Sequence, residues 1–197
     1  MRVKICGITN KEDAINAIKA GACALGFVFY KPSPRYIEPL DALKIVENLP
    51  PFVQTVGLFV NETTDFINKV CKDSKMQLAQ IIDDENKVDF LKLEVKYLKV
   101  LRAKNKEDLI NLKDDYYLVD AFVQEFGGAG KRLELSWFKD IDCSKFILAG
   151  GLSSENLKEL NGFNFFGVDV SSAVEKQKGK KDNQKMIDFV KAANEII

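Results

Sequence analysis

The sequence predicts an α/β protein that forms one single-domain (β/α)8 barrel, the TIM-barrel architecture, over residues 1–197. Eight short runs of apolar and β-branched residues recur along the chain, and each is nearly continuous in apolar character, as strands covered on both faces are. Segments with helical spacing or helix-capping residues separate these runs. No composition break, low-complexity tract or linker divides the chain.

The eight predicted strands lie close together in sequence, which favours a closed barrel. An open doubly wound sheet is the structural alternative, but it usually has fewer strands and a glycine-rich first turn. The first turn here, Cys6–Thr9, contains a single glycine. We expect the strands at Val3–Ile8, Ala24–Tyr30, Thr55–Val60, Gln77–Ile82, Tyr97–Ala103, Tyr116–Ala121, Phe146–Gly151 and Phe165–Val170.

We expect a helix after each strand, and several termini carry signals for one. Thr9-Asn10-Lys11-Glu12 is typical of a capping box, and Gly21 marks the end of the first helix. Pro39 suits the first turn of the second helix. Ser153 or Ser154 is the expected cap of the helix after the seventh strand. The weakest helical patterns lie near 85–93 and 136–139.

Composition excludes several classes of protein. Lys and Arg number 29 and Asp and Glu also 29, so nothing global favours a nucleic acid or membrane partner. The chain has no histidine, and its four cysteines lie far apart, so we expect neither a metal site nor a disulfide framework. No apolar run approaches the roughly 18 residues of a membrane span, and no signal peptide is evident. A cytoplasmic protein is expected.

Polar residues at the predicted carboxyl ends of strands are the candidates for chemistry, because barrels of this class place their active sites there. Cys6 ends the first strand, Asp120 the sixth and Asp169 the eighth. Lys4 and Cys6 are two residues apart on one strand, so their side chains face the same side. We expect Lys4 to form a buried pair with Asp169 and to favour the thiolate form of Cys6.

The ends of the last two strands predict a phosphate site. Gly150 and Gly151 allow backbone N–H groups to approach an anion, and Ser171 and Ser172 add hydroxyl donors. Loops after strands seven and eight commonly bind phosphate in these barrels. A short turn is expected to begin near Ser171, whereas the alternative for the two glycines is an ordinary tight turn.

Two loops add further candidates. Arg35 follows two prolines after the second strand, and a held arginine can bind a planar carboxylate through two hydrogen bonds. The loop after the sixth strand contains Gly127 and Gly128 and is a candidate substrate cover. The remaining cysteines are expected to be small buried apolar residues: Cys23, Cys71 and Cys143.

Six motifs carry a resemblance to a known family: Lys4–Thr9, Gly26–Tyr30, Ser33–Ile37, Val56–Asn61, Gly127–Lys131 and Val168–Ser172. Together they resemble the phosphoribosylanthranilate isomerase family over essentially the whole chain. The resemblance implies a cofactor-free (β/α)8 barrel of tryptophan biosynthesis, acting on a phosphosugar–anthranilate substrate as a monomer or homodimer. Its reaction is an Amadori rearrangement of N-(5-phosphoribosyl)anthranilate to the 1-deoxyribulose 5-phosphate.

The resemblance also implies roles for individual residues. Cys6 matches the general base that removes the ribose C2′ proton, and Asp120 matches the general acid that protonates the ring oxygen. Arg35 matches the residue that binds the anthranilate carboxylate. Other expected substrate contacts are Gly127, Gly128 and Asp169, and the expected phosphate ligands are Gly150, Gly151, Ser171 and Ser172.

The chain departs from the family pattern at two strands. The fourth strand ends in Gln80–Asp83, where the family usually has Gln-Leu-His-Gly, so Ile82 replaces the histidine. Arg102 stands on the fifth strand, where a small or apolar residue is expected, and is a candidate replacement donor. The alternatives are a related phosphosugar isomerase or epimerase, which would need a different first strand or histidines, and a non-catalytic phosphate-binding barrel.

Overall fold

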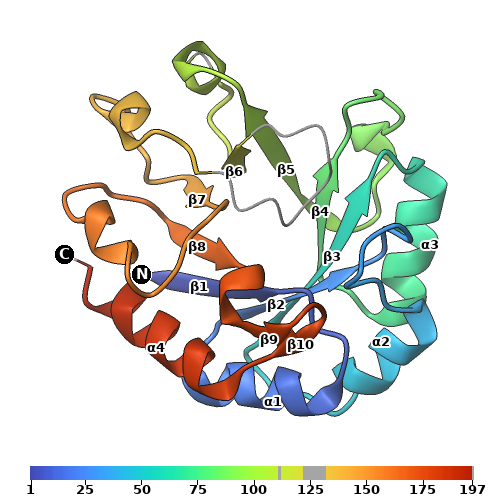
Figure 1. The fold of residues 1–197 in the computed structure, drawn as a ribbon. Coiled ribbons are helices and arrows are strands. Elements are labelled where there is room, and N and C mark those ends of the chain that lie inside the picture. Colours follow the sequence, from blue (N-terminus) through green and yellow to red (C-terminus); the bar gives the residue numbers. More distant parts are fainter. Residues whose placement is uncertain (111, 122–131, 197) are drawn as a thin grey trace.

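Eight parallel strands close into a barrel in sequence order, with the eighth paired to the first (Figure 1). The computed structural model describes residues 1–110, 112–121 and 132–196. The prediction of a closed barrel is confirmed, and all eight predicted strands are present with somewhat different bounds. They are β1 (Arg2–Cys6), β2 (Ala24–Val28), β3 (Gln54–Val60), β4 (Leu78–Ile82), β5 (Lys96–Ala103), β6 (Tyr117–Ala121), β7 (Phe146–Leu148) and β8 (Gly167–Val170).

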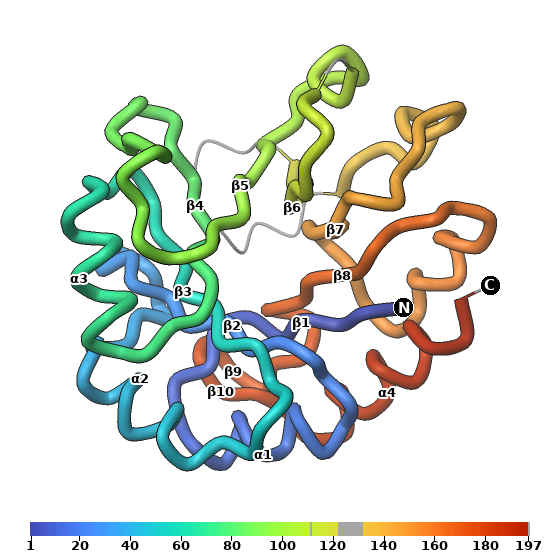
Figure 2. The backbone as a smooth tube through the Cα atoms, turned by 180° about the vertical axis from the view of Figure 1, so that it is seen from behind, coloured from blue at the N-terminus to red at the C-terminus, as the bar shows by residue number. Residues whose placement is uncertain are grey.

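The helices cover the barrel unevenly. Figure 2 shows α1, α2, α3 and α4 around one side of the barrel, whereas short turns and loops project from β5 to β8. The prediction of a helix after every strand is therefore wrong between β4 and β8. All the helices among the described residues there are short 3-10 helices. The α-helices are α1 (Lys11–Ala20), α2 (Pro39–Val46), α3 (Thr64–Ser74) and α4 (Asn183–Asn194). The 3-10 helices are η1 (Phe90–Lys92), η2 (Lys106–Leu109), η3 (Leu135–Phe138), η4 (Leu157–Leu160) and η5 (Ser172–Val174).

Side-chain hydrogen bonds explain why no helix forms directly after β4. The Asp83 carboxylate accepts from the backbone N–H groups of Lys87, at 2.8 Å, and Val88, at 3.2 Å. The Asn61 side chain accepts from the N–H of Glu85 at 3.2 Å. These bonds fold the segment into turns and compete with helical hydrogen bonding.

The helix ends agree with the sequence in part. Gly21 ends α1 in the left-handed conformation, and Pro39 opens α2, as predicted. The cap of α1 is Asn10, which accepts from the N–H of Asp13 at 2.8 Å, so the predicted capping box lies one residue too early. The expected Ser153 or Ser154 cap is also wrong, because the backbone N–H of Ser153 instead donates to Asn156.

Two apolar clusters hold the fold. The larger lies between the barrel and its surrounding helices and turns, and its largest fully buried side chains include Phe27, Phe59 and Phe189. The smaller contains Leu98, Leu118 and Ala149. These three side chains point into the barrel, because successive residues of a strand alternate between its faces. Burying both faces in this way leaves the carboxyl ends of the strands for polar groups.

A two-stranded hairpin, β9 (Glu175–Gln177) and β10 (Lys180–Lys181), stands between η5 and α4. It docks on the loop after β1, where the Thr9 hydroxyl donates to the carbonyl of Gly179 at 2.6 Å. The hairpin thereby brings two charged residues, Glu175 and Lys181, to the carboxyl end of the barrel. Within the part of the chain that the structure describes, no helix is long and apolar enough to cross a membrane.

All four cysteines are free. Cys71 and Cys143 are buried as predicted, but Cys23 is exposed, so the prediction of a buried residue is wrong there. Cys23 lies just before β2, at the amino-terminal end of the barrel, and its thiol donates to the carbonyl of Val3 at 3.3 Å.

Candidate active site

Cys6, the last residue of β1, lies with Lys4 and Asp169 at the carboxyl end of the barrel. Register pairs Lys4 of β1 with Asp169 of β8, and Lys4 Nζ donates to Asp169 Oδ1 at 2.8 Å. Burial alone would lower the pKa of Lys4, but the charge of Asp169 and the neighbouring Cys6 raise it overall. The predicted buried pair is confirmed, with a protonated lysine beside the Cys6 thiol.

Gly26 on β2 leaves the space in which these groups meet. A Cβ atom at Gly26 would lie 2.8 Å from Cys6 Sγ and 2.9 Å from Lys4 Nζ, closer than such contacts occur. The thiol and the ammonium therefore approach each other over a position that has no side chain. Any larger residue would displace one of them.

Asp120, on β6, is a carboxyl group that holds a proton unusually well. Burial raises its pKa to about 6, the Asp169 charge adds to the rise, and a hydrogen bond from the N–H of Ala121 and the charge of Arg102 oppose it. A carboxyl with this pKa is partly protonated near neutrality, as a general acid must be. Arg102 lies beside Asp120 in the register of β5 and β6 and forms an ion pair with Asp84.

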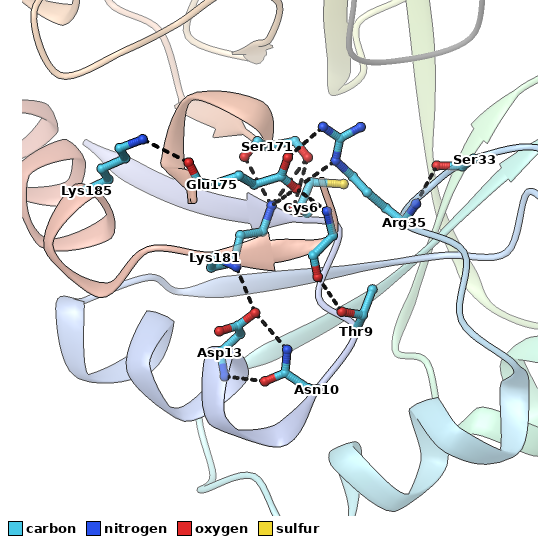
Figure 3. Close-up of polar contacts among 11 residues, drawn as sticks. Cys6, Thr9, Asn10, Asp13, Ser33, Arg35, Ser171, Glu175, Lys181 and Lys185 are labelled. Carbon is cyan, nitrogen blue, oxygen red and sulfur yellow. Dashed lines mark hydrogen bonds and ion pairs between the residues drawn. The ribbon is translucent and has the colours of Figure 1, made fainter. Parts of the chain in front are cut away.

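Arg35 is fixed by a carboxylate rather than by the prolines alone. Its Nε and Nη2 donate to the two oxygens of Glu175, each at 2.8 Å (Figure 3). Both side chains are buried. Gly7 has a φ of 80° and allows this placement, since a Cβ there would lie 2.5 Å from Arg35 Cδ. Figure 3 shows the Arg35 guanidinium beside the Cys6 sulfur.

Lys181 connects this pair to the end of β8. Its Nζ donates to Glu175 Oε1 at 3.0 Å and to the carbonyl oxygen of Ser171 at 3.1 Å. The Ser171 hydroxyl donates in turn to the carbonyl oxygen of Cys6 at 3.1 Å. Burial lowers the pKa of Lys181 despite the Glu175 charge. The hairpin, the turn after β8 and the end of β1 are thus joined by one polar network (Figure 3).

The expected phosphate loops have the geometry that their residue types imply. Gly150 and Gly151 have φ values of 87° and 61°, which residues with a side chain rarely adopt, so the chain turns sharply after β7. The turn predicted near Ser171 is confirmed as η5, which begins at Ser172. Gly127 and Gly128 lie outside the described residues.

Sequence reasoning missed Glu175 and Lys181. Lys181 stands in a segment with three other lysines, Lys176, Lys178 and Lys180, which is typical of a solvated surface. The fold of the hairpin buries Lys181 alone among these lysines: Lys181 is 1% exposed, whereas the other three are exposed. Among the described residues, no group of three or more Cys, Asp or Glu side chains is arranged to hold a metal ion.

A closed parallel barrel with an acid, a thiol and glycine turns at the carboxyl ends of its strands has the arrangement of (β/α)8-barrel enzymes. The family model for N-(5'phosphoribosyl)anthranilate (PRA) isomerase matches residues 3–192. The chain belongs to this family.

Individual relatives of the family match this chain along nearly its whole length. An N-(5'-phosphoribosyl)anthranilate isomerase of a Nitratiruptor species is 58% identical, with 98% of each chain covered. The crystal structure of phosphoribosyl anthranilate isomerase from Thermotoga maritima is 37% identical, with a TM-score of 0.88 and 98% of each chain covered. A further isomerase structure, in complex with reduced 1-(o-carboxyphenylamino)-1-deoxyribulose 5-phosphate, is 35% identical, with a TM-score of 0.84 and 98% of each chain covered.

Proposed function

We propose that this chain converts N-(5'-phosphoribosyl)anthranilate to 1-(2-carboxyphenylamino)-1-deoxyribulose 5-phosphate in tryptophan biosynthesis, with Asp120 as general acid and Cys6 as general base. Membership of the isomerase family supports the reaction. The raised pKa of Asp120, about 6, is the observation that carries the assignment of roles. A carboxyl group that kept its ordinary pKa would be ionised near neutrality and could not donate a proton.

The reaction begins with ring opening. Asp120 donates its proton to the furanose oxygen, the C1′–O bond breaks, and the electron pair of the anilino nitrogen forms a protonated Schiff base. The positive nitrogen acidifies the C2′ proton. A base of modest strength is then sufficient for the second step.

Cys6 supplies that base as a thiolate. It removes the C2′ proton, the C–H electrons form the C1′–C2′ double bond, and the Schiff base becomes a neutral enolamine that tautomerises to the ketone product. The Lys4 ammonium, held by Asp169 at 2.8 Å, lies beside the Cys6 sulfur. Cys6 thus serves as the base in a chain that contains no histidine.

The remaining site residues bind the two charged ends of the substrate. We assign the anthranilate carboxylate to Arg35, which is held beside Cys6. The assigned phosphate ligands are Gly150, Gly151, Ser171 and Ser172, and Gly127, Gly128 and Asp169 are assigned as further substrate contacts. Residues 1–197 act as one domain, a monomer or homodimer, in the cytoplasm; a solved relative from Thermotoga maritima is described as dimeric.

The proposal is tested by the loss of substrate fluorescence during conversion of freshly prepared N-(5'-phosphoribosyl)anthranilate. Cys6→Ser and Asp120→Asn are each expected to lower kcat by at least about 100-fold, the typical contribution of a general acid or base. Cys23→Ser, an exposed thiol far from the site, serves as the matched control. Turnover that survives both substitutions would refute the assigned roles. No turnover by the wild type would support a non-catalytic barrel.

A further inference from the structure

The Arg35–Glu175 pair has an unusual geometry for a residue assigned to bind substrate, because the arginine already holds a buried carboxylate. Glu175 occupies the edge of the guanidinium formed by Nε and Nη2, with both hydrogen bonds at 2.8 Å. A guanidinium has five N–H groups in a rigid plane. The pair uses two of them, and the edge formed by Nη1 and Nη2 can still take a second carboxylate.

Charge at the site also favours a second anion. Glu175 is the single carboxylate shared by two cations, since Lys181 Nζ donates to Oε1 at 3.0 Å. The backbone N–H of Gly179 donates to the same oxygen at 3.2 Å. Burial alone would raise the pKa of Glu175, but Arg35 and Lys181 lower it overall, so Glu175 is ionised. With both cations charged, the cluster of Arg35, Lys181 and Glu175 carries one net positive charge, counted without the neighbouring Cys6.

The cluster is anchored on two sides. The backbone N–H of Lys181 donates to the carboxylate of Asp13 at 2.8 Å, which fixes β10 on the first turn of α1. Lys181 Nζ also donates to the Ser171 carbonyl at 3.1 Å, at the end of β8. The position of Arg35 is therefore tied to the strand ends that carry Cys6 and the expected phosphate ligands.

We propose that Glu175 is a positioning residue for substrate recognition: it holds Arg35 with its Nη1–Nη2 edge open to the anthranilate carboxylate, and Lys181 holds Glu175. The inference rests on the proposed function, in which Arg35 binds that carboxylate. The Glu175 carboxylate already accepts from Arg35, Lys181 and the N–H of Gly179, so we assign it no contact with the reacting atoms. Its substitution should impair affinity for the carboxylate more than the rate of the chemical steps.

The test compares two ligands and one neutral substitution. Equilibrium binding of reduced 1-(o-carboxyphenylamino)-1-deoxyribulose 5-phosphate is measured beside its phenylamino counterpart, which lacks the carboxylate. Glu175→Gln is expected to weaken the first ligand by about tenfold, the loss of a well-oriented charged hydrogen-bond pair, and the second by less than about twofold. In turnover, KM rises by a similar factor while kcat falls less. Glu159→Gln, which breaks the exposed Arg132–Glu159 pair, is expected to change neither ligand.

Charge and orientation predict opposite results for Glu175→Gln. Removing a negative charge beside Arg35 should strengthen carboxylate binding if charge alone matters, so unchanged or tighter binding of the carboxylated ligand would overturn the inference. Equal weakening of both ligands would show a merely structural role. Glu175→Asp, which keeps the charge but shortens the side chain, gives the same comparison if Glu175→Gln does not fold. Wild-type protein that neither binds nor converts the carboxylated compounds would instead refute the proposed function.

Discussion

Lys4 Nζ and Asp169 Oδ1 lie 2.8 Å apart inside the barrel, directly below the thiol of Cys6. Both side chains are about nine-tenths buried. Neither charge could remain there without the other, because desolvation of an unpaired ion is costly. The pair therefore links the stability of the barrel to the presence of a cation at the proposed base.

Lys4→Met should be strongly destabilising. It leaves the Asp169 carboxylate buried without its partner, which typically costs about 3–5 kcal/mol in the free energy of unfolding. Urea unfolding at pH 7 measures this loss. The control is Lys69→Met, which removes an exposed pair with Asp73 and should cost less than about 1 kcal/mol. A loss for Lys4→Met no greater than that of the control would show that the buried pair contributes little.

Gly26→Ala should reduce activity more than stability. The added Cβ would lie 2.8 Å from Cys6 Sγ, so the thiol or the Lys4 ammonium must move, and a displacement of this kind can cost about 100-fold in kcat. Gly162→Ala is the control, because a Cβ there meets nothing within 4 Å. The only cost in that variant is backbone strain at a φ of 86°, so its kcat should equal that of the wild type. Equal kcat values for the two variants would contradict the proposed crowding.

The pH profile of kcat/KM should have an alkaline limb near the pKa of Asp120, about 6. The active form of a general acid is protonated, so activity falls as pH rises through that value, and kcat/KM reports the free enzyme. Arg102→Met should move the limb to higher pH, because the Arg102 charge lowers the pKa of Asp120. Arg132→Met, on the exposed pair with Glu159, should leave it in place. A limb that does not respond to Arg102 would assign it to another group.

Asp120→Asn should stabilise the protein at alkaline pH while lowering kcat by at least about 100-fold. The folded-state pKa of Asp120, about 6, lies above its ordinary value of 3.8, so ionisation is less favourable in the folded state than in the unfolded chain. This group therefore lowers stability above about pH 6 and has no such effect below its ordinary pKa. We expect the variant to be more stable by about 1–3 kcal/mol at pH 8, with the difference shrinking towards pH 4. Thermal unfolding at both pH values measures it, and a difference independent of pH would refute the raised pKa.

The sequence by itself determined the eight strands, the closed barrel and the residues at the carboxyl ends of the strands. These follow from local patterns, since continuous apolar runs need cover on both faces and the residue after such a run lies at the rim. The Lys4–Asp169 pair was also predictable, because β1 and β8 must be neighbours once the barrel closes. A charge facing the interior at one position then requires a partner on the adjacent strand.

Only the tertiary structure decided which helices form and what surrounds Arg35. Asp83 and Asn61 use their side chains to fold the segment after β4 into turns, a competition that apolar periodicity does not reveal. Glu175 and Lys181 come from a hairpin in a lysine-rich segment, and two of the groups that they bind, the Arg35 guanidinium and the Asp13 carboxylate, lie far away in sequence. Contacts between charged residues far apart in sequence depend on where the folded chain places those residues in space. That placement cannot be predicted from a local sequence pattern.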